Sequence, residues 1–251
     1  MVIESRSNER VKNARRLLLR KERKRTGLHL IESIKLVQEA VLSGARIQAC
    51  FIEDGVSFAP PEGAVTLTVG RSVLESLCES RTPQGVVAVV ETPPLAPPDE
   101  YPAGLVVALD GVQDPGNVGA ILRTADAFGA AGILLSPECA DPYAPKTLRA
   151  AMGSTYHLPV WQGELPEELA RMQPQGFFAL CGDLKGDETL PPPAEKTVLV
   201  IGSEGQGVSD AVASLCARYR LPMRGKAESL NASVAAGILL YVVSGQMPQK
   251  P

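Results

Sequence analysis

The segment that decides the fold is residues 105–117, which read LVVALDGVQDPGN. Five apolar residues come first, and a loop of polar and turn-forming residues leads into a helical pattern at 118–128. The same alternation continues with apolar runs at 132–135, 177–181 and 197–201 and helical patterns at 145–152, 167–172 and 210–217. Apolar strands that alternate with helices predict an α/β fold with a parallel sheet covered on both faces. Ligands bind beyond the carboxyl ends of such strands, so functional residues should lie in the loops that follow them.

The front of the chain shows a shorter alternation of helices and strands. Helical patterns at 33–43 and 72–78 are interspersed with β-like runs at 47–52, 65–69 and 86–90. Five prolines then fall within residues 92–102, a composition that favours an extended segment outside helices and sheets. We therefore predict a small α/β domain at 1–91, a proline-rich linker at 92–102 and a larger α/β domain at 103–251.

Positive charge is concentrated at the N-terminus. Residues 1–25 contain ten Lys and Arg against three Glu, a net charge of +7, so the net charge of −3 for the whole chain leaves −10 for the rest. Lys and Arg release counterions from phosphates, which favours an arm that binds RNA or DNA. The alternative is a solvated basic helix that only aids solubility. Val11, Ala14, Leu17 and Leu18 recur at helical spacing, so we predict one amphipathic helix.

Cysteine and histidine usage argues against metal sites and disulfides. The five cysteines are widely spaced, no C-x-x-C occurs, and His29 and His157 are the only histidines, so zinc-finger and His-rich sites are excluded. The N-terminus lacks the apolar core of a signal peptide, and the longest apolar run, 234–243, is too short to span a bilayer. We expect a cytoplasmic protein with no membrane segment and no metal.

The first candidate loop ends at Asn117, which we expect to cap the following helix. Arg123 comes four residues after Gly119 in that helix. Helical side chains lean toward the N-terminus, so the guanidinium of Arg123 should approach the loop, where it could hold a phosphate or a substrate. The alternative is a surface ion pair with Asp126, three residues on.

Two further loops follow apolar runs. Residues 202–207 read GSEGQG, a spacing that differs from the dinucleotide-binding G-x-G-x-x-G, and Glu204 at its centre would repel a phosphate. This loop suits a cationic or hydroxyl-bearing ligand, and a solvent-facing turn is the alternative. Residues 221–231 lead from a short strand into an apolar helix at 232–243, with Ser229 and Asn231 at the helix start. Capping explains one of these two polar residues, and either could be the cap.

Taken together, the three loops resemble the motifs of the SpoU/TrmH family, RNA ribose 2'-O-methyltransferases of the SPOUT class. The matching stretches are Asn117-x-Gly119-x-x-x-Arg123, IGSEGQG at 201–207, and Leu221-Pro-Met followed by Ser229-Leu-Asn231. The front of the chain is similar to the L30e-like substrate-binding domain of members that act on ribosomal RNA, at residues 8–12, 27–32, 39–40 and 82–89. Ser33 stands where the family commonly has glycine.

The resemblance implies a C-terminal trefoil knot, a homodimer with the active site at the subunit interface, and S-adenosylmethionine as cofactor. The catalytic residues that it implies are Asn117, Arg123, Glu204, Ser229 and Asn231. The implied cofactor-binding residues are Gly202, Glu204, Gly205, Leu221, Met223, Ser229 and Leu230. RNA contacts are expected from Arg6, Arg10, Lys12, Arg15, Arg16 and Arg123.

The implied activity is methyl transfer to a ribose 2'-hydroxyl, with a nucleotide of large-subunit ribosomal RNA as the leading substrate. Arginine keeps its proton in proteins, so we expect Arg123 to grip the target nucleotide while the phosphate or Glu204 takes part in proton removal. A transfer-RNA methylase and an antibiotic-resistance ribosomal RNA methylase stay open as alternatives. So do a catalytically silent RNA-binding factor for ribosome assembly and a nucleotide-binding enzyme of the doubly wound type.

Overall fold

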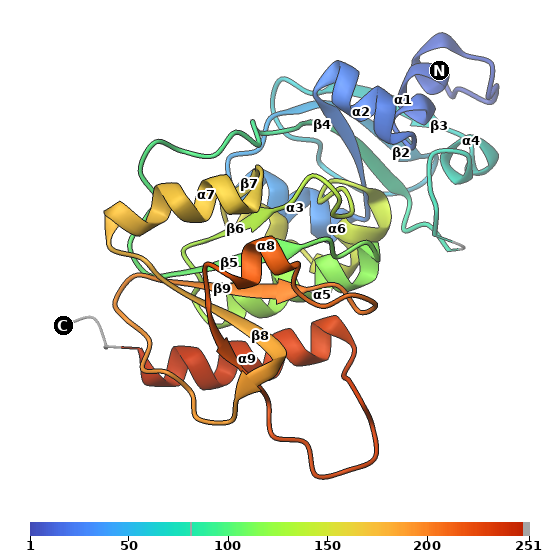
Figure 1. Ribbon diagram of the computed structural model, residues 1–251. Helices are drawn as coiled ribbons and strands as arrows, with labels where there is room; N and C mark the ends of the chain where they lie inside the picture. The colour runs from blue at the N-terminus through green and yellow to red at the C-terminus, as the bar shows by residue number, and fades with distance from the viewer. Residues whose placement is uncertain (81, 248–251) are drawn as a thin grey trace. The chain divides into compact units, whose positions relative to one another are not determined.

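The computed structural model describes residues 1–80 and 82–247, and contacts divide the chain into two compact units (Figure 1). The first unit contains residues 1–93 together with 141–157, and the second contains 94–140 and the residues from 158 onward. The segment 141–157 therefore belongs to a unit far from it in sequence. The sequence pattern did not indicate this exchange, and the domain limits 1–91, 92–102 and 103–251 stay predictions.

The first unit is built on a four-stranded mixed sheet. The strands are β1 (Leu28–Glu32), β2 (Ile47–Glu53), β3 (Val65–Val69) and β4 (Val86–Glu91), in the order β1-β4-β2-β3. Strand β4 runs antiparallel to both neighbours, and β2 pairs with β3 in parallel. The helices of this unit are α1 (Glu9–Arg16), α2 (Arg20–Thr26), α3 (Ile34–Leu42), α4 (Arg71–Glu75) and α6 (Pro145–Ala151), with a 3-10 turn at Ser154–Tyr156.

The basic arm forms two helices, so the prediction of one continuous helix is wrong. Helix α1 ends at Arg16, and α2 begins at Arg20. The break is stabilised by Arg23, whose guanidinium donates to the carbonyl oxygens of Leu17 (2.8 Å) and Leu18 (2.9 Å) and pairs with Asp141 at 2.7 Å. Arg23 is 6% exposed, so this cation has a structural role. The predicted apolar side of the arm is confirmed, because Val11, Ala14 and Leu17 are buried.

The second unit confirms the parallel sheet. Its six strands all run parallel in the order β10-β8-β9-β5-β6-β7. Their bounds are β5 (Leu105–Asp110), β6 (Gly132–Leu135), β7 (Val160–Gln162), β8 (Phe178–Asp187), β9 (Thr197–Gly202) and β10 (Ala217–Tyr219). The central strands β5 and β9 are buried along almost their whole length, which explains why the sequence shows them as uninterrupted apolar runs.

Helices cover both faces of this sheet (Figure 1). Helices α7 (Leu165–Met172) and α8 (Asp210–Ala213) share one buried cluster with Val106, Val198 and Val200 of the strands. Helices α5 (Pro115–Ala127) and α9 (Ala232–Gln246) lie against each other on the opposite face. The strands therefore end, on the carboxyl side, in loops that lead into α5, α8 and α9. The implied trefoil knot stays a prediction.

The proline-rich segment is fastened to the second unit from Pro94 onward. The carbonyl oxygen of Leu95 accepts from the backbone N–H of Gln162 at 2.7 Å, and that of Pro98 accepts from Arg171 at 2.9 Å. Tyr101 is buried, stands edge-on to Trp161 and donates to Glu168 at 2.7 Å. These contacts hold the proline-rich segment in an extended conformation outside any sheet. Proline has no backbone N–H to donate, so such a segment cannot form a regular ladder of strand hydrogen bonds.

Candidate functional site

The three candidate loops all leave the carboxyl edge of the parallel sheet. The first connects β5 to α5, the second connects β9 to α8, and the third connects β10 to α9. Asp110, the last residue of β5, accepts from the backbone N–H of Ser209 at 2.7 Å and so joins the first loop to the second.

A chain of side-chain hydrogen bonds connects all three loops. Asn231 Nδ2 donates to Asn117 Oδ1 at 3.1 Å, and Asn117 Nδ2 donates to the Glu204 carboxylate. Asn117 lies in the first turn of α5, Glu204 in the second loop and Asn231 at the end of the third, and the partners are 87 and 114 residues apart in sequence. Three of the residues predicted to be catalytic are therefore brought together.

The capping assignments partly differ from those expected. Asp114 caps α5, since its carboxylate accepts from the backbone N–H of Asn117 at 3.0 Å; the prediction that Asn117 is the cap is wrong. Pro115 occupies the first helical position, where its missing N–H costs nothing. Asn117 lies inside the first turn, so its amide is free to reach Asn231 and Glu204. Asn231 caps α9 through its Oδ1, which accepts from Ser233 at 3.0 Å and Val234 at 3.3 Å.

A cavity of about 670 Å³ opens between the second and third loops, within the range typical of small-molecule sites. All seven residues predicted to bind the cofactor line it: Gly202, Glu204, Gly205, Leu221, Met223, Ser229 and Leu230. Glu204 and Ser229 are also in the predicted catalytic set. Asn117 and Asn231 are not among the lining residues, but Asn117 is bonded to Glu204, and Asn231 directly follows the lining residue Leu230.

The glycines of the second loop have distinct roles. A Cβ on Gly202 would lie 2.0 Å from the carbonyl carbon of Gly207, so the turn itself requires glycine there. That turn closes on two hydrogen bonds between Ser203 and Gly207, at 2.9 and 3.1 Å. Around Gly205, by contrast, a Cβ would meet nothing within 4 Å. The loop thus presents backbone at Gly205 to an open volume, which fits a ligand held by main-chain groups.

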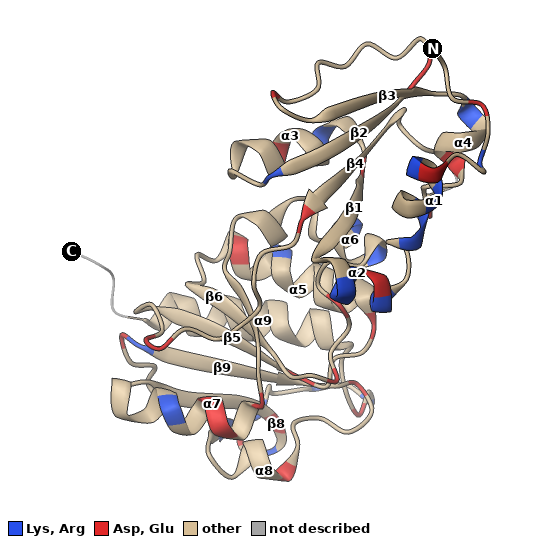
Figure 2. Ribbon diagram, turned by 90° about the horizontal axis from the view of Figure 1, so that it is seen from above, with Lys and Arg blue, Asp and Glu red and all other residues tan. Residues whose placement is uncertain are grey.

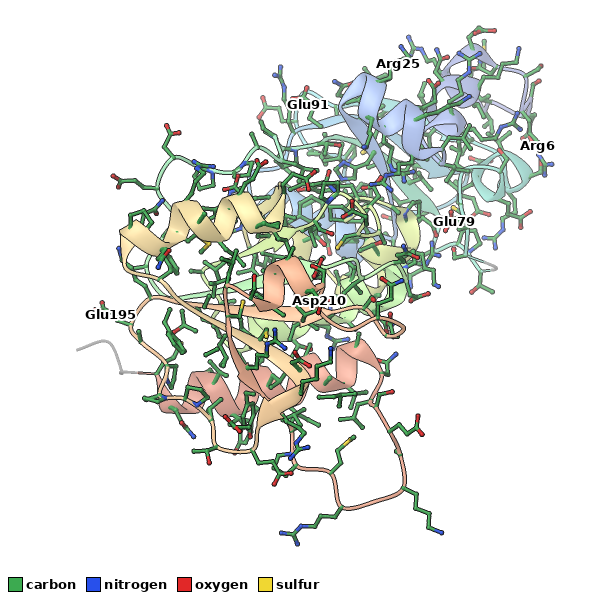
Figure 3. All side chains as sticks on the ribbon, viewed as in Figure 1. Arg6, Arg25, Glu79, Glu91, Glu195 and Asp210 are labelled. Carbon is green, nitrogen blue, oxygen red and sulfur yellow. The ribbon has the colours of Figure 1, made fainter. Side chains whose placement is uncertain are left out.

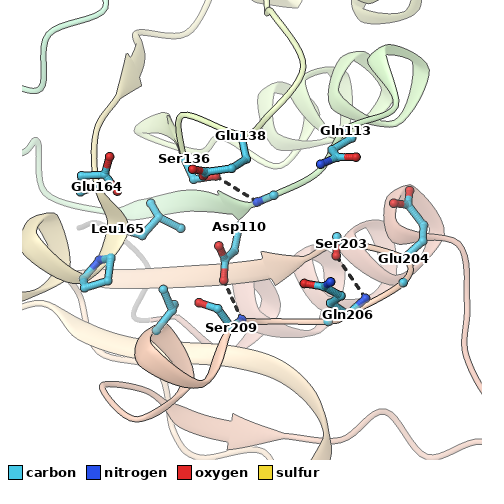
Figure 4. A pocket seen from close by; sticks show the side chains of 15 residues that line it. Asp110, Gln113, Ser136, Glu138, Glu164, Leu165, Ser203, Glu204, Gln206 and Ser209 are labelled. Atoms are coloured by element: carbon cyan, nitrogen blue, oxygen red, sulfur yellow. Dashed lines mark hydrogen bonds between the residues drawn. The ribbon is translucent and has the colours of Figure 1, made fainter.

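A second cavity, of about 580 Å³, adjoins the other side of the same loop (Figure 4). Asp110, Glu138 and Glu164 contribute carboxylates to its lining, and Glu204 borders both cavities. Ser136 is held there by the backbone N–H of Gly111 at 3.0 Å. A lining with this charge disfavours phosphate, in agreement with the inference from Glu204.

Among the described residues, Arg123 forms no hydrogen bond or ion pair with the other residues predicted to be catalytic. Its side chain is exposed on α5, it does not line either cavity, and within the described part of the chain it forms no salt bridge. The alternative of an ion pair with Asp126 is therefore absent from the residues described. Phe128 follows one turn later, 36% exposed and edge-on to Tyr241 of α9 at 6.1 Å between ring centres.

Five of the six basic residues expected to contact RNA belong to the first unit, and the sixth, Arg123, is on α5 of the second. Figure 2 shows Lys and Arg gathered along α1 and α2. Arg10, Arg15 and Arg16 are exposed on α1, and Figure 3 shows the exposed side chain of Arg6 at the surface. Arg6 Nε also donates to the carbonyl oxygen of Ser72 at 2.9 Å, and Lys12 pairs with Glu9 at 3.3 Å. These cations are available to phosphates, apart from the partial neutralisation of Lys12.

Sequence reasoning missed part of the cavity wall. The sequence predicts a strand that ends at Cys181, whereas β8 continues to Asp187 and pairs with β10. Asp183, Lys185 and Tyr219 consequently line the cavity. A signal was available, because Asp183 and Lys185 directly follow an apolar run, at the strand end where α/β sheets bind ligands.

Neither a metal cluster nor a membrane segment is found in the described residues. No group of three or more His, Cys, Asp or Glu is arranged to hold a metal ion in the part of the chain described. Across residues 1–80 and 82–247, none of the helices combines the length and the apolar character needed to cross a bilayer.

Comparison with known proteins matches both parts of the chain to family models. Residues 104–241 match the SpoU rRNA methylase family, and residues 8–88 match the MRM3-like substrate-binding domain. The first match covers the three loops of the site, and the second covers most of the first unit.

Relatives extend the match to nearly the full length. The chain is 34% identical to the 23S rRNA (guanosine(2553)-2'-O)-methyltransferase RlmP of Bacillus subtilis, covering 97% of this chain and 99% of that protein. An rRNA methyltransferase from Sinorhizobium meliloti, solved with AdoMet bound, superposes with a TM-score of 0.86 at 31% identity over 96% of both chains. The methyltransferase AviRb from Streptomyces viridochromogenes, also with AdoMet, gives 0.83 at 31% identity over 95% of this chain and 98% of that one. The chain belongs to the SpoU rRNA methylase family and is a methyltransferase.

Proposed function

We propose that this protein transfers a methyl group from S-adenosylmethionine to a ribose 2'-hydroxyl of large-subunit ribosomal RNA. The observation that carries the proposal is the hydrogen-bond chain Asn231–Asn117–Glu204, which joins the three family motifs at the rim of one cavity. The name of the Bacillus subtilis relative, matched over nearly its whole length, supports the choice of ribosomal RNA. A cytoplasmic location follows from that substrate and stays a prediction.

The residues of the 670 Å³ cavity suit this cofactor. Leu221, Met223 and Leu230 offer apolar surface to an adenine ring, and the backbone around Gly205 offers hydrogen-bonding groups. Asp183 and Glu204 supply negative charge near a ligand that carries a positive sulfonium. When bound, the cofactor supplies an electrophilic methyl group.

The chemistry asked of the protein is mainly alignment and proton removal. Holding the acceptor oxygen in line with the methyl group and excluding water lowers the barrier by up to about 7–11 kcal/mol. The hydroxyl is a weak nucleophile, so a base must draw off its proton. Glu204 is the carboxylate at the cavity that Asn117 orients, and we assign it, or a phosphate of the RNA, as the acceptor. Arg123 stays protonated and binds the phosphate or hydroxyl of the target nucleotide.

We also propose that the active protein is a homodimer. Val234, Ile238 and Tyr241 leave an apolar surface exposed on α9, and Phe128 of α5 extends it. Such a surface favours pairing with a second copy, because burying it removes apolar area from water. Arg123 lies on α5 outside its own chain's cavity, so pairing through this face would let the partner subunit's Arg123 complete the site.

Two measurements test the proposed function. Calorimetry with S-adenosylmethionine should show binding that Glu204→Ala weakens. Mapping of 2'-O-methyl groups in total RNA from a strain lacking the gene should show one site lost from large-subunit ribosomal RNA. Loss of a methyl group from transfer RNA instead would replace the proposed substrate, and an unchanged RNA with no cofactor binding would refute the enzymatic activity.

A further inference from the structure

The cations of the second unit fall into two groups. Arg171, Arg218 and Arg220 pair with carboxylates, at 2.7, 3.3 and 3.2 Å, and Lys196 donates to a backbone carbonyl at 3.0 Å. The remaining described cations form no side-chain hydrogen bond or salt bridge within the described chain: Arg123, Lys185, Arg224 and Lys226. Arg123 already has a proposed role, which leaves the other three to be explained.

Arg224 and Lys226 occupy the tip of the loop between β10 and α9. Residues on both sides of the tip, Met223 and Glu228, line the 670 Å³ cavity, whereas residues 224–227 do not. The whole segment 222–229 is exposed, and Figure 1 shows it standing away from the sheet. The two cations therefore face solvent next to the cavity mouth, on the same loop that forms its wall.

The loop is held only at its ends. The backbone N–H of Arg220 donates to Asp187 at 2.8 Å, and Asn231 caps α9. Between them, no backbone hydrogen bond involves residues 221–230 within the described chain. A segment attached in this way can adjust to a ligand, and two like charges two residues apart are relieved by a polyanion.

Resting on the function proposed above, we propose that Arg224 and Lys226 bind phosphates of the RNA strand next to the target nucleotide. Lys185 lines the cavity itself and supplies one further positive charge there. The second unit, residues 94–140 and 158–251, contains nine Lys and Arg against sixteen Asp and Glu, a net charge of −7, so a nonspecific attraction of this unit for RNA is not expected. Arg224 and Lys226 therefore act through direct contacts with individual phosphates, and these contacts set which nucleotide of the RNA strand lies over the cavity.

Salt dependence of binding tests this assignment directly. Arg224→Gln, Lys226→Gln and the double variant are compared with Lys196→Gln, whose cation lies at the amino end of β9, the opposite edge of the sheet. The probe is ribosomal RNA from a strain lacking the gene. Each loop substitution should reduce the slope of log Kd against log salt by about 0.7–0.9. The double variant should weaken binding roughly tenfold at moderate salt, and Lys196→Gln should change neither quantity.

Kinetics and proteolysis give independent readouts. The double variant should raise KM for RNA while kcat at saturating RNA and the Kd of the cofactor stay unchanged. Trypsin cleaves after Arg224 and Lys226, so RNA should slow cleavage of the wild-type loop when S-adenosylhomocysteine saturates the cavity in both arms. An unchanged salt slope, or RNA that leaves cleavage equally fast, would overturn the proposal. If the wild-type protein methylates no RNA, the proposed function itself fails, a result distinct from these.

Discussion

Replacing Asn117 by Asp tests whether the three loops act as one unit. The two side chains have nearly the same shape, but Asp has no N–H to donate. The substitution removes the hydrogen bond to Glu204 and sets two carboxylates against each other. A hydrogen bond to a charged group contributes about 1.5–3 kcal/mol, and like charges about 4 Å apart repel by ~1 kcal/mol in water. Glu204 is exposed, so the solvent-screened value applies and the total cost is about 3 kcal/mol.

Asn117→Ala separates the two contributions. It removes the hydrogen bonds to Glu204 and from Asn231 without adding charge, at a cost of about 2 kcal/mol. Asn117 does not line the cavity, so either variant affects the cofactor through its bonded partners Glu204 and Asn231 and the loops that carry them. If the whole cost appears in binding, the cofactor Kd rises about 30-fold for Ala and about 150-fold for Asp.

Calorimetry at low and high salt distinguishes repulsion from a lost hydrogen bond. The difference between the Asp and Ala variants should narrow in 0.5 M salt, because screening shortens the range of the repulsion. Asn13→Asp, an exposed change of equal charge on α1, serves as the matched control and should bind the cofactor normally. Wild-type affinity in both Asn117 variants, or an Asp variant no weaker than Ala at low salt, would refute the idea that this chain holds the loops.

Ser33 has a φ of 94°, a backbone conformation that is strained for a residue with a Cβ. Ser33→Gly relieves this strain but removes the hydroxyl that accepts from the backbone N–H of Leu36 and caps α3. The net effect should be a free energy of unfolding of the first unit that is about 1 kcal/mol higher, measured by urea denaturation. A loss of stability would contradict that reading. Burial, with a smaller effect of Arg23, lowers the pKa of His29 to about 3. As the pH falls, His29 is therefore protonated in the unfolded chain before it is protonated in the folded one. The free energy of unfolding should decrease as the pH drops from about 6.5 toward 3, and at pH 5 it should be about 2 kcal/mol lower than at neutral pH. His29→Gln should flatten this dependence, and an equal slope in both proteins would count against it. Arg123→Ala and Arg123→Lys should both abolish methyl transfer while calorimetry shows normal cofactor binding, because a point charge does not replace the planar guanidinium. Loss of binding and turnover together would disprove that separation of roles.

The parallel sheet could be predicted because its central strands are buried on both faces and so appear as unbroken apolar runs. Strand β7, Val160–Gln162, has only three residues and escapes any periodicity argument. The break between α1 and α2 was not predictable either, since Arg23 stabilises it partly through Asp141, a residue 118 positions away. Two long-range ion pairs link residues 141–157 to the rest of the first unit: Asp141 with Arg23, and Arg149 with Glu32 at 3.1 Å. Local sequence carries no information about such partners.

At the site, the sequence located the loops but assigned one cap to the wrong residue. Asp114 and Asn117 are both residues that cap helices well, and the deciding signal was Pro115, which prefers the position just after the cap. Reading that signal would have left Asn117 inside the helix with a free amide, which is the condition for the bond to Glu204. That Arg123 lines neither cavity of its own chain could not be predicted, because motif order and spacing do not give the distances between side chains of different loops.

Charge is divided over the second unit in a way that fits a cationic cofactor and a polyanionic substrate. The 670 Å³ cavity is lined by four carboxylates and one cation, so its wall favours a positively charged ligand. The carboxylates belong to Asp183, Glu204, Asp210 and Glu228, and the cation is Lys185. A ligand that has lost its positive charge loses that attraction, and the same carboxylates therefore favour release once the methyl group has left. A phosphate is repelled from this wall, which keeps the RNA backbone outside while a single ribose hydroxyl reaches in. Cations that grip the backbone consequently have to stand at the rim, and Arg224 and Lys226 occupy that position.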